Sequence, residues 1–516
     1  MRDVDEFAGC AVGIDLGTTN TVVAASRNGE VELIRNRDGG YLHPSVVAFT
    51  PSGARLVGDR ARRRRALDPE NTIFSAKRLI GRRFSSADVQ DAVRRYPYRI
   101  AGGRNDETIV NTRAGEVPVV EISSYVLEHV KELAEAQLDQ AVTQCVVTVP
   151  AHFGDAQRTA TRRAAERAGF DVLRILNEPT AAALAYGLKD GTRKRIAIFD
   201  LGGGTFDVTV LAIEGHLFEV LATGGHPYLG GDNIDQALAE MLADEFEASH
   251  GIVLAGQRHA RGKLLQAAES IKRELSEHTS CTGSLEELAY GEGGVALELD
   301  YQITRAQLEG LASPLLDRAI GLVEKVLADA ETAPTLIDEV LLVGGSTKIP
   351  LVRRRVEEAF LSAAKAAVDP MLAVAAGAAI QAEFLSDPPD ARDGAPLLMD
   401  VAAHGIGVVT AGRFNEPVIE KNTPIPAVRT RVFSPASDNQ TTVEIRVCES
   451  DRRQFTSEQE LGTLRLEGLP PGRRGDTEIE VSFTLDSDGI LQVAAKDRKS
   501  GRSQSAILTV SGLAEQ

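Results

Sequence analysis

Residues 196–211 read IAIFDLGGGTFDVTVL, and this stretch decides the fold. An apolar run rich in β-forming residues leads into an acidic residue, three glycines and a threonine, and a second alternating run follows. This pattern predicts two strands joined by a tight turn. The residues of interest at the turn are Asp200, Gly202, Gly203, Gly204, Thr205 and Asp207. Glycine N–H groups can approach an anion closely because no Cβ intervenes, and carboxylates favour a hard cation. The hairpin is therefore a candidate phosphate and cation site, and a purely structural Gly-rich hairpin is the alternative.

A second copy of this pattern lies near the N-terminus. Residues 11–25 read AVGIDLGTTNTVVAA, again strand, Asp-Leu-Gly, hydroxyl-rich turn and strand. The matched positions are Asp15 with Asp200, Gly17 with Gly203 or its neighbour, and Thr18 and Thr19 with the region of Thr205. The chain thus contains an internal repeat of one hairpin. Two such hairpins can face each other across a cleft and grip consecutive phosphates, with Asp15 and Asp200 directed at Mg²⁺.

Composition limits the classes of function. The 516 residues carry 57 Lys and Arg against 74 Asp and Glu, and the net charge of -17 argues against nucleic acid as the main partner. The four cysteines lie far apart without metal or disulfide spacing, which indicates a reducing cytoplasm: Cys10, Cys145, Cys281 and Cys448. The first residues lack a signal-peptide pattern, and no long apolar run is present. We therefore expect a cytoplasmic protein that neither leaves the cell nor spans a membrane.

Strand and helix patterns alternate over the first three quarters of the chain. We expect helices over residues 122–138, 151–170, 178–187, 262–278 and 373–385, a further helix starting within 229–235, and buried strands at 145–150 and 338–344. Residues 71–84 read as a short helical stretch carrying Lys77, and the basic run 60–65 reads as a solvated helix face. Residues 386–400 are polar with Pro and Gly, and short alternating strands follow. This order predicts an α/β fold, a linker and a β-sandwich.

Nine motifs occur in one order and spacing. They are DLGTTN, AKRLIGRRF, TVPAHFGDAQR, NEPTAAALAYG, DLGGGTFDV, LGGDNID, LVGGSTKIP, PLLMD and VFSPASDNQ. In these motifs the chain resembles the 70-kDa heat-shock chaperones of the bacterial DnaK type from about Ala11 to Gly512. The resemblance implies a two-lobed, actin-like ATPase domain at 1–385, an interdomain linker at 386–400 and a β-sandwich peptide-binding domain at 401–516. The family's helical lid after the β-sandwich is expected to be absent.

The resemblance also implies an ATP site with Mg²⁺, and K⁺ as a further candidate ion. Asp15 and Asp200 would orient the hydrated Mg²⁺. Lys77 would position the attacking water, with Glu178 and Asp207 assisting deprotonation. Residues implied to hold the phosphates are Gly17, Thr18, Thr19, Asn20, Gly202, Gly203, Gly204 and Thr205. Residues implied to form the adenosine pocket are Glu269, Lys272, Arg273, Ser276, Gly344, Gly345, Ser346 and Lys348, where Arg273 could stack on the base.

The same resemblance implies peptide binding and coupling between domains. The implied peptide groove comprises Val408, Ala411, Phe433, Ala436, Val443 and Ile445, where an extended apolar segment would bind. The implied coupling residues are Pro150, Arg158 and Arg174, with Leu397, Leu398 and Asp400 in the linker. Partners would be unfolded or extended polypeptide clients, a J-domain co-chaperone and a nucleotide exchange factor, with no nucleic acid or membrane. ATP and peptide would each shift the affinity for the other.

Four departures from the family qualify these expectations. Without the lid, peptide release should be fast and affinity weak. Met371 and Leu372 stand where the family has an acidic pair, so an acidic residue near the ATP site is missing. Ala411 replaces a larger residue over the groove, which suggests a more open groove. Ala395 and Pro396 replace an aliphatic pair at the start of the linker, so its docking is expected to be weaker.

Two alternative functions stay open on the sequence. The first is a client-specific, nucleotide-switched binding protein with little general refolding activity. Indifference to all but one of many apolar peptides would favour it. The second is a sugar kinase or actin-like protein that shares only the two-lobed ATP fold. The expected β-sandwich argues against it, as would failure of any sugar to accelerate ATP turnover.

Overall fold

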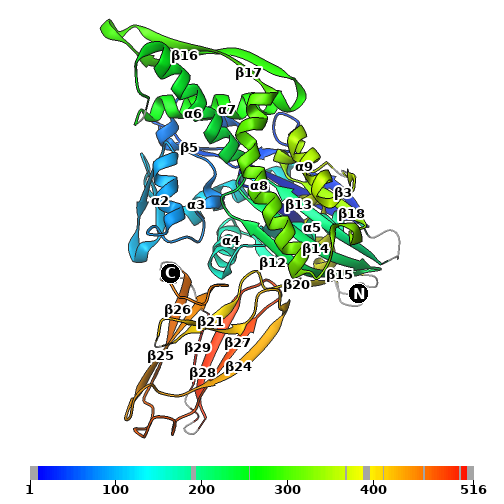
Figure 1. Ribbon diagram of the computed structural model, residues 1–516, viewed down its shortest axis with the longest axis vertical. Helices are drawn as coiled ribbons and strands as arrows, with labels where there is room; N and C mark the ends of the chain where they lie inside the picture. The colour runs from blue at the N-terminus through cyan, green and yellow to red at the C-terminus, as the bar shows by residue number, and fades with distance from the viewer. Residues whose placement is uncertain are drawn as a thin grey trace.

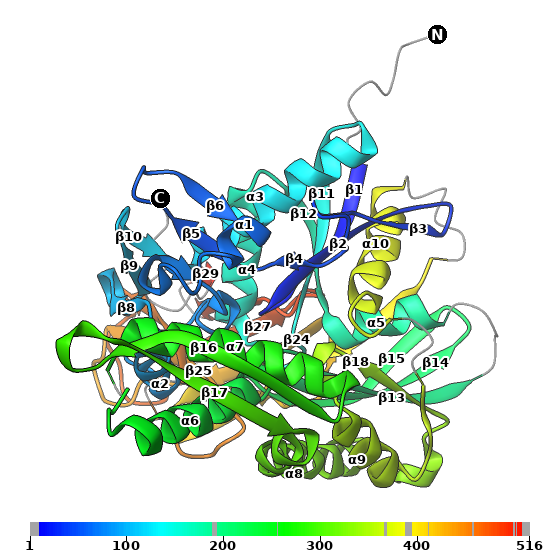
Figure 2. The same ribbon diagram turned by 90° about the horizontal axis from the view of Figure 1, so that it is seen from above.

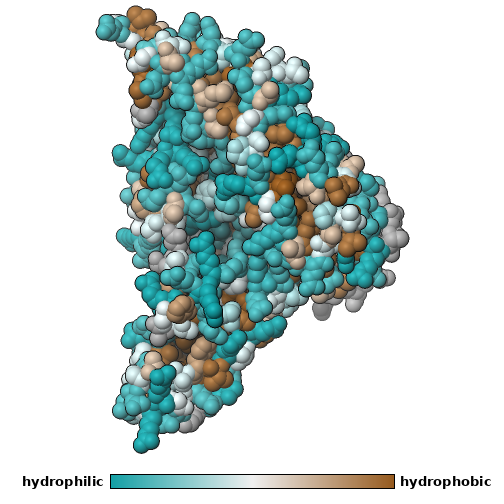
Figure 3. Space-filling model, in the orientation of Figure 1, coloured by the Kyte–Doolittle hydropathy of each residue, from teal (hydrophilic) through white to brown (hydrophobic). Residues whose placement is uncertain are grey.

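The computed structural model describes residues 10–187, 193–254, 256–365, 369–387, 395–410, 412–456, 459–498, 501 and 503–507. Figure 1 shows a large α/β body with a smaller part built of strands beneath it. Seen from above in Figure 2, the helices of the α/β body surround its strands. No helix in the described ranges is long and apolar enough to cross a membrane. The face drawn in Figure 3 is mainly hydrophilic, with apolar residues in small groups.

The first lobe of the α/β body is built on a mixed sheet. Its strands are β1 (Cys10–Leu16), β2 (Asn20–Arg27), β3 (Glu30–Leu33), β11 (Val142–Val149) and β12 (Asp171–Asn177), in the order β12-β11-β1-β2-β3, with β4 (His43–Pro44) beside β2. β1 pairs with β2 in antiparallel fashion and with β11 in parallel. The hairpin predicted from residues 11–25 is therefore confirmed, and it lies at the centre of the sheet.

The second lobe repeats this topology. Its strands are β13 (Lys194–Leu201), β14 (Phe206–Glu214), β15 (Leu217–His226), β18 (Glu339–Val343) and β19 (Ala364–Lys365), in the order β19-β18-β13-β14-β15. β13 pairs with β14 in antiparallel fashion and with β18 in parallel, as β1 does with β2 and β11. The internal repeat expected from the two hairpins is confirmed at the level of whole sheets.

Two helices from different parts of the chain pack between the two sheets. They are α5 (Glu178–Tyr186) and α10 (Ala373–Ser386), both rich in alanine. A Cβ on Gly377 would lie 1.7 Å from the Ala181 carbonyl oxygen, and one on Gly13 would lie 2.0 Å from the Ala379 backbone nitrogen. Small residues therefore let α10 contact α5 and β1 almost backbone to backbone. This close packing joins the lobes at the base of the cleft.

The remaining elements surround the sheets. The other long helices are α3 (Val119–Leu138), α4 (Asp155–Arg167), α6 (Gly231–His250), α7 (Arg258–Glu277), α8 (Arg305–Asp329) and α9 (Pro350–Phe360). Shorter elements of the first lobe are β5 (Val47–Phe49), β6 (Arg55–Val57), β7 (Thr72–Ile73), β8 (Arg99–Gly102), β9 (Thr108–Thr112), β10 (Gly115–Pro118), α1 (Asp59–Arg62) and α2 (Ala87–Arg95). β16 (Ser280–Tyr290) and β17 (Ala296–Thr304) form a long hairpin at the top of Figure 1. The expected helices are confirmed, with ends shifted by a few residues.

Two local predictions in the first lobe are wrong. Residues 71–84 do not form a helical stretch: they contain β7 and a single 3₁₀ turn, Ala76–Arg78, preceded by Ser75 with a left-handed φ of 54°. A left-handed residue interrupts a right-handed helix, and the turn instead directs Lys77 inward. The basic run 60–65 is also not simply a solvated helix face, because α1 ends at Arg62 and Arg65 is only 9% exposed.

The C-terminal part consists of two four-stranded antiparallel sheets around one core. One sheet has the order β22-β21-β25-β26 and the other β24-β27-β28-β29. Their bounds are β21 (Ile406–Val409), β22 (Asn415–Ile419), β24 (Ala427–Phe433), β25 (Thr442–Glu449), β26 (Glu460–Glu467), β27 (Ile479–Leu485), β28 (Leu491–Asp497) and β29 (Ser503–Ile507). Residues from both sheets share one hydrophobic cluster. We call this part the β-domain. β22 was not expected from the sequence, because Pro417 interrupts its pattern.

A strand from the expected linker joins the second lobe. β20 (Leu397–Val401) runs parallel to β15 and pairs on its other side with β23 (Pro424–Ile425). The sheet of the second lobe thus continues from the central hairpin through β15 to the start of the β-domain. The boundaries expected for the linker and the two domains stay a prediction.

Candidate nucleotide site and its connection to the β-domain

The turns of the two repeated hairpins face each other at contact distance. A Cβ on Gly203 would lie 2.0 Å from Thr19 Oγ1, and one on Gly204 would lie 2.5 Å from Thr18 Oγ1. Real Cβ atoms do not approach other atoms this closely, so only glycine fits at these two positions. The prediction that the two hairpins meet across a cleft is confirmed.

Arg78 fixes the shape of the second turn. Its guanidinium donates to the Gly204 carbonyl oxygen from Nε (3.0 Å) and Nη2 (2.7 Å), and Nη2 also lies 2.8 Å from Asn233 Oδ1. The side chain is 5% exposed. Sequence reasoning missed Arg78, although it directly follows Lys77 in the motif AKRLIGRRF. A basic residue next to the predicted catalytic lysine was the available signal.

A cavity of about 510 Å³ opens beside these turns. Most of the predicted nucleotide residues line it: Asp15, Gly17, Thr18, Thr19, Asn20, Lys77, Glu178, Asp200, Gly202, Gly203, Thr205, Glu269, Lys272, Arg273, Ser276, Gly344, Gly345, Ser346 and Lys348. Gly204 and Asp207 are buried behind its wall. Met371, which stands where the family has an acid, also lines the cavity. Residues from distant parts of the chain therefore converge on one site of nucleotide size.

Carboxylates outnumber cations at the deep end of this cavity. Lys77 forms a buried ion pair with Glu178. Burial raises the pKa of Asp15 to about 7, with Glu178 adding to the rise and Lys77 opposing it. Burial and the neighbouring carboxylates hold the pKa of Asp200 well above its usual range, and burial raises the pKa of Glu178 despite Lys77. Without a further cation, this concentration of buried negative charge is unfavourable.

A magnesium ion with a nucleotide fits this donor set. Mg²⁺ is usually held by one or two carboxylates together with substrate phosphates and water, rather than by a protein cage. Asp15 and Asp200 supply two such carboxylates on the cavity wall. Within the described part of the chain, no group of three or more His, Cys, Asp or Glu side chains could hold a metal ion. The arrangement therefore matches a metal that arrives with phosphates.

Helix α7 forms the other side of the cavity. Glu269, Lys272, Arg273 and Ser276 project from one face of it, as their spacing predicts. Lys272 Nζ lies 2.7 Å from Asp235 Oδ2, and the two side chains are 12% and 9% exposed. Burial raises the pKa of Asp235 to about 7, although Lys272 opposes that rise. Glu269, Lys272 and Ser276 are thus partly buried on this face, while Arg273 is exposed, and the adenosine pocket stays a prediction.

An ion pair connects the two lobes above this pocket. Arg65 Nη1 of the first lobe lies 2.8 Å from Glu269 Oε2 of α7, and the Arg65 guanidinium stacks 4.0 Å from the centre of the Phe74 ring. Glu269 has a lowered pKa because the cations Arg65 and Lys272 outweigh the effect of burial. Within the basic run 60–65, Arg65 is thus the residue that contacts the opposite lobe through Glu269. Its partner lies about 200 positions away, so no local pattern could identify it.

The loop between β11 and α4 adds a residue that the sequence analysis did not select. Asp207 Oδ1, on β14, accepts from the backbone N–H of His152 (3.2 Å) and lies 2.7 Å from His152 Nδ1. Both side chains are buried, at 1% and 6% exposure. His152 therefore fixes the orientation of a predicted catalytic carboxylate.

Arg158 of α4 contacts both parts of the molecule. It donates to the carbonyl oxygens of Phe153 (2.8 Å) and Ala151 (3.2 Å) and to Asn177 Oδ1 (2.7 Å) in the first lobe, and to the Asp488 carbonyl oxygen (3.1 Å) in the β-domain. Its side chain is 4% exposed. A single buried guanidinium thus satisfies acceptors from both sides of the interface.

Neighbouring residues extend this interface. Arg162 pairs with Asp488, and the Leu491 backbone N–H donates to Asp155 Oδ1 (2.8 Å). Of the other predicted coupling residues, Pro150 is buried at the end of β11, and Arg174 on β12 lies near enough for its charge to act on Asp488. Asp155, Arg158 and Arg162 thus form the surface that α4 presents to the β-domain, and the coupling roles of Pro150 and Arg174 stay predictions.

The predicted linker residues lie in β20. Leu398 is 8% exposed and pairs in register with Phe218 of β15, while Leu397 is 61% exposed. Asp400 is buried and accepts from Thr180 Oγ1 (3.0 Å) at the start of α5. The linker segment is therefore docked against the second lobe in this structure. That it docks more weakly than the linkers of other family members stays a prediction.

The predicted peptide residues do not gather on one surface here. Val408 and Ile445 are 6% and 3% exposed and belong to the core of the β-domain. Phe433 and Val443 pack against that core and are partly buried, and Ala436 is exposed. Ala411 lies outside the described residues. A peptide groove therefore stays a prediction.

Comparison with known protein families agrees with this geometry. The family model described as Hsp70 protein matches residues 11–515, which is nearly the whole chain. Members of that family bind ATP with Mg²⁺, hydrolyse ATP and work with unfolded clients and co-chaperones. Together with the paired hairpins, the cavity between the lobes and the docked β-domain, this match shows that the chain belongs to the Hsp70 family of ATP-dependent chaperones.

Proposed function

We propose that ATP bound in the 510 Å³ cavity controls the affinity of the β-domain for extended apolar peptide segments. The observation that carries the proposal is the position of β20, which extends the same sheet that carries the catalytic hairpin. A change at the hairpin can reach β20 through only one intervening strand, β15. Nucleotide and peptide would then shift the same equilibrium, which is that between the docked and the undocked β-domain.

For hydrolysis we propose a mechanism of positioning and electrostatics. Lys77 positions the attacking water and balances charge on the γ-phosphoryl oxygens, while Glu178 and Asp207 assist deprotonation. Thr205 and the turn glycines hold the phosphates through hydroxyl and N–H groups. Asp15 and Asp200 would hold Mg²⁺, which would supply positive charge against the phosphates when bound, and K⁺ is a further candidate ion. The ion pair of Lys77 with Glu178 and the bonds from His152 to Asp207 support these roles.

We further propose that the docked arrangement described above is the state of low peptide affinity. Val408 and Ile445 are packed in the core here, so a bound apolar side chain has no access to them. Undocking would free the β-domain to rearrange around a peptide. A J-domain co-chaperone and a nucleotide exchange factor are the proposed partners of the cycle, and the cytoplasm is the proposed location.

Fluorescence anisotropy of a labelled, extended, apolar peptide tests this function. The signal should be high with the nucleotide-free protein and fall when MgATP is added. Lys77→Ala should show the same fall in anisotropy as wild type, because we propose that ATP binding rather than hydrolysis drives peptide release. Lys325→Ala, on the exposed face of α8, is the matched control. A signal that stays high with MgATP would contradict nucleotide control. Binding of one peptide among many would favour the client-specific alternative.

A further inference from the structure

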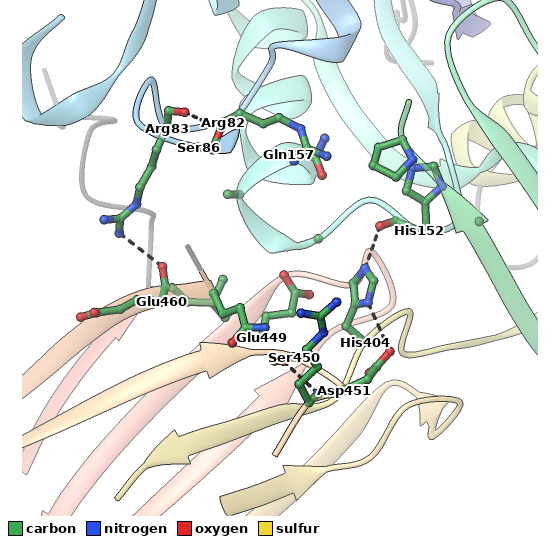
Figure 4. Close-up of a pocket in the computed structure, with 18 of the residues that line it drawn as sticks. Arg82, Arg83, Ser86, His152, Gln157, His404, Glu449, Ser450, Asp451 and Glu460 are labelled. Carbon is green, nitrogen blue, oxygen red and sulfur yellow. Dashed lines mark hydrogen bonds and ion pairs between the residues drawn. The ribbon is translucent and has the colours of Figure 1, made fainter. Parts of the chain in front are cut away.

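His404 lies in the interface between a backbone carbonyl oxygen on one side of its ring and a carboxylate on the other. It follows β20 and precedes β21. Its Nε2 lies 3.0 Å from the carbonyl oxygen of His152 in the first lobe, and its Nδ1 lies 3.8 Å from Asp451 Oδ2 in the β-domain. Figure 4 shows the ring between these two partners. A neutral imidazole can donate to the His152 carbonyl oxygen from one N–H, whereas the imidazolium donates the same bond more strongly and also pairs its charge with Asp451.

The surroundings of His404 favour the charged ring. Glu449 and Asp451 come from the end of β25, and the Gly405 N–H holds Asp451 in place by donating to its Oδ1 (2.8 Å). Burial lowers the pKa of His404, but the nearby carboxylates of Asp451 and Glu449 outweigh burial, so its pKa is raised. Asp451 in turn has its pKa lowered to about 2, because the contacts with His404 and Gly405 outweigh burial.

Other charged groups line the same cavity as His404 and come from three further segments. They line the interdomain cavity of about 440 Å³ shown in Figure 4: Arg82 and Arg83 from the first lobe, Arg452 beyond β25, and Glu460 at the start of β26. Arg82 is engaged by Asp88 at 2.9 Å, and Arg83 donates to the Glu460 carbonyl oxygen at 3.3 Å. The His404 side chain remains 36% exposed, so water can exchange protons with it.

The contact on His152 leads directly to the catalytic hairpin. The same residue that accepts from His404 through its carbonyl oxygen holds Asp207 Oδ1 through its N–H and ring. His152 is 6% exposed, so it has little freedom to move independently of either partner. A shift of His404 is therefore transmitted to the carboxylate behind the nucleotide cavity over two contacts.

We propose that His404 is a proton-dependent latch: as the imidazolium it holds the β-domain against His152 and, through His152, keeps Asp207 positioned. The proposal rests on the proposed nucleotide control of docking and deepens it. His404 takes up a proton on docking, because the contact of its Nε2 with the His152 carbonyl oxygen crosses the interface and raises its pKa. The stabilisation is complete below the ordinary histidine pKa and is lost as the pH rises through the raised value. One linked proton changes the docking equilibrium by at most about tenfold per pH unit.

The test compares three forms of the full chain between pH 5.5 and 8.5. His404→Gln keeps one donor without a charge, and His404→Arg keeps a permanent charge. Docking is measured as amide hydrogen exchange of Leu491, whose N–H is covered by Asp155 across the interface. Comparison of the forms at each pH removes the intrinsic pH dependence of exchange. The exposed His259→Gln in α7 is the matched control.

We expect protection of Leu491 in wild type, relative to His404→Gln, to rise as the pH falls and to approach that of His404→Arg at low pH. His259→Gln should follow wild type. The kcat of His404→Gln for ATP should fall severalfold and lose part of its dependence on pH, with little change in KM, because the cavity wall is untouched. If the ratio of Leu491 amide protection in wild type to that in His404→Gln is the same at all pH values, the proposal is overturned. If wild type shows no peptide release with MgATP at any pH, the proposed function itself fails, and the exchange ratio still decides the latch.

Discussion

Gly203 of the second hairpin lies so close to Thr19 of the first that a Cβ would come within 2.0 Å of the threonine hydroxyl oxygen. The two lobes thus meet through their phosphate turns, and the width of the cleft is set at this contact. A close approach of two backbones at a phosphate site is a recurrent use of glycine.

Gly203→Ala should therefore weaken ATP binding. The added methyl group must push Thr19 or the turn aside, and overpacking of this kind usually costs about 1–3 kcal/mol. If that strain falls on the closed, nucleotide-bound cleft, affinity drops by roughly tenfold to a hundredfold. Isothermal titration calorimetry with MgATP measures this change in affinity. Gly321→Ala in α8, where the new Cβ meets nothing within 4 Å, is the control, and equal affinity of both variants would contradict the role of the contact.

Lys77→Ala should lower the rate of the chemical step. The substitution leaves Glu178 as an unpaired buried carboxylate in the cavity wall and removes the cation proposed to balance developing charge. Loss of one such stabilising group typically reduces kcat by about 10²–10³. Single-turnover hydrolysis measures the step directly. A reduction of less than about fivefold would show that Lys77 has no part in catalysis.

Arg158→Ala should leave ATP binding nearly unchanged but impair the peptide release that ATP drives. The variant leaves acceptors unpaired on both sides of the interface, including Asn177 and the Asp488 carbonyl oxygen, and so disfavours docking. We expect ATP affinity to change less than about threefold while ATP-driven peptide release becomes slow or incomplete. Stopped-flow anisotropy follows the release. Arg167→Ala, exposed at the end of the same helix, should release peptide like wild type.

Asp155 gives docking a second dependence on pH. Burial raises its pKa to about 8 in the docked state, so docking takes up a proton there as well. The contribution of Asp155 is therefore strongest at low pH and is lost as the pH rises through about 8. Asp155→Asn keeps the acceptor for the Leu491 N–H and cannot ionise. The docking equilibrium of this variant should therefore vary less with pH between pH 6 and 9 than that of wild type. The matched control is the exposed Asp244→Asn, and a pH profile shared by both variants would argue against this assignment.

The repeated hairpins and the order of elements were predictable from local sequence. Their strands, turns and glycines lie within about fifteen residues of each other, and the alternation of apolar residues marks each strand. The convergence of Lys77, Glu178 and α7 on one cavity followed from the family resemblance, and the structure brings them together. Their roles in catalysis await measurement.

The contacts that join distant segments could not be predicted. Arg65 with Glu269, His152 with Asp207 and His404 with His152 each connect residues far apart in the chain. No periodicity or motif records such pairs, because they depend on how the lobes and the β-domain pack. The helix expected around Lys77 failed for a local reason: Ser75 adopts a left-handed conformation, which helix propensity does not reveal. Val408 and Ile445, placed at a peptide groove by the family resemblance, are buried in this structure, and the groove stays a prediction.

The most direct test of the central claim is hydrogen exchange of the amides of β20 with and without MgATP. This strand pairs with β15 of the second lobe in the docked structure, and the account expects the pairing to open when the β-domain undocks. We predict strong protection of residues 397–401 with MgATP, weaker protection without nucleotide, and loss of the ATP effect in Arg158→Ala. Protection that is the same with and without MgATP would show that the nucleotide does not control docking, and it would contradict the account.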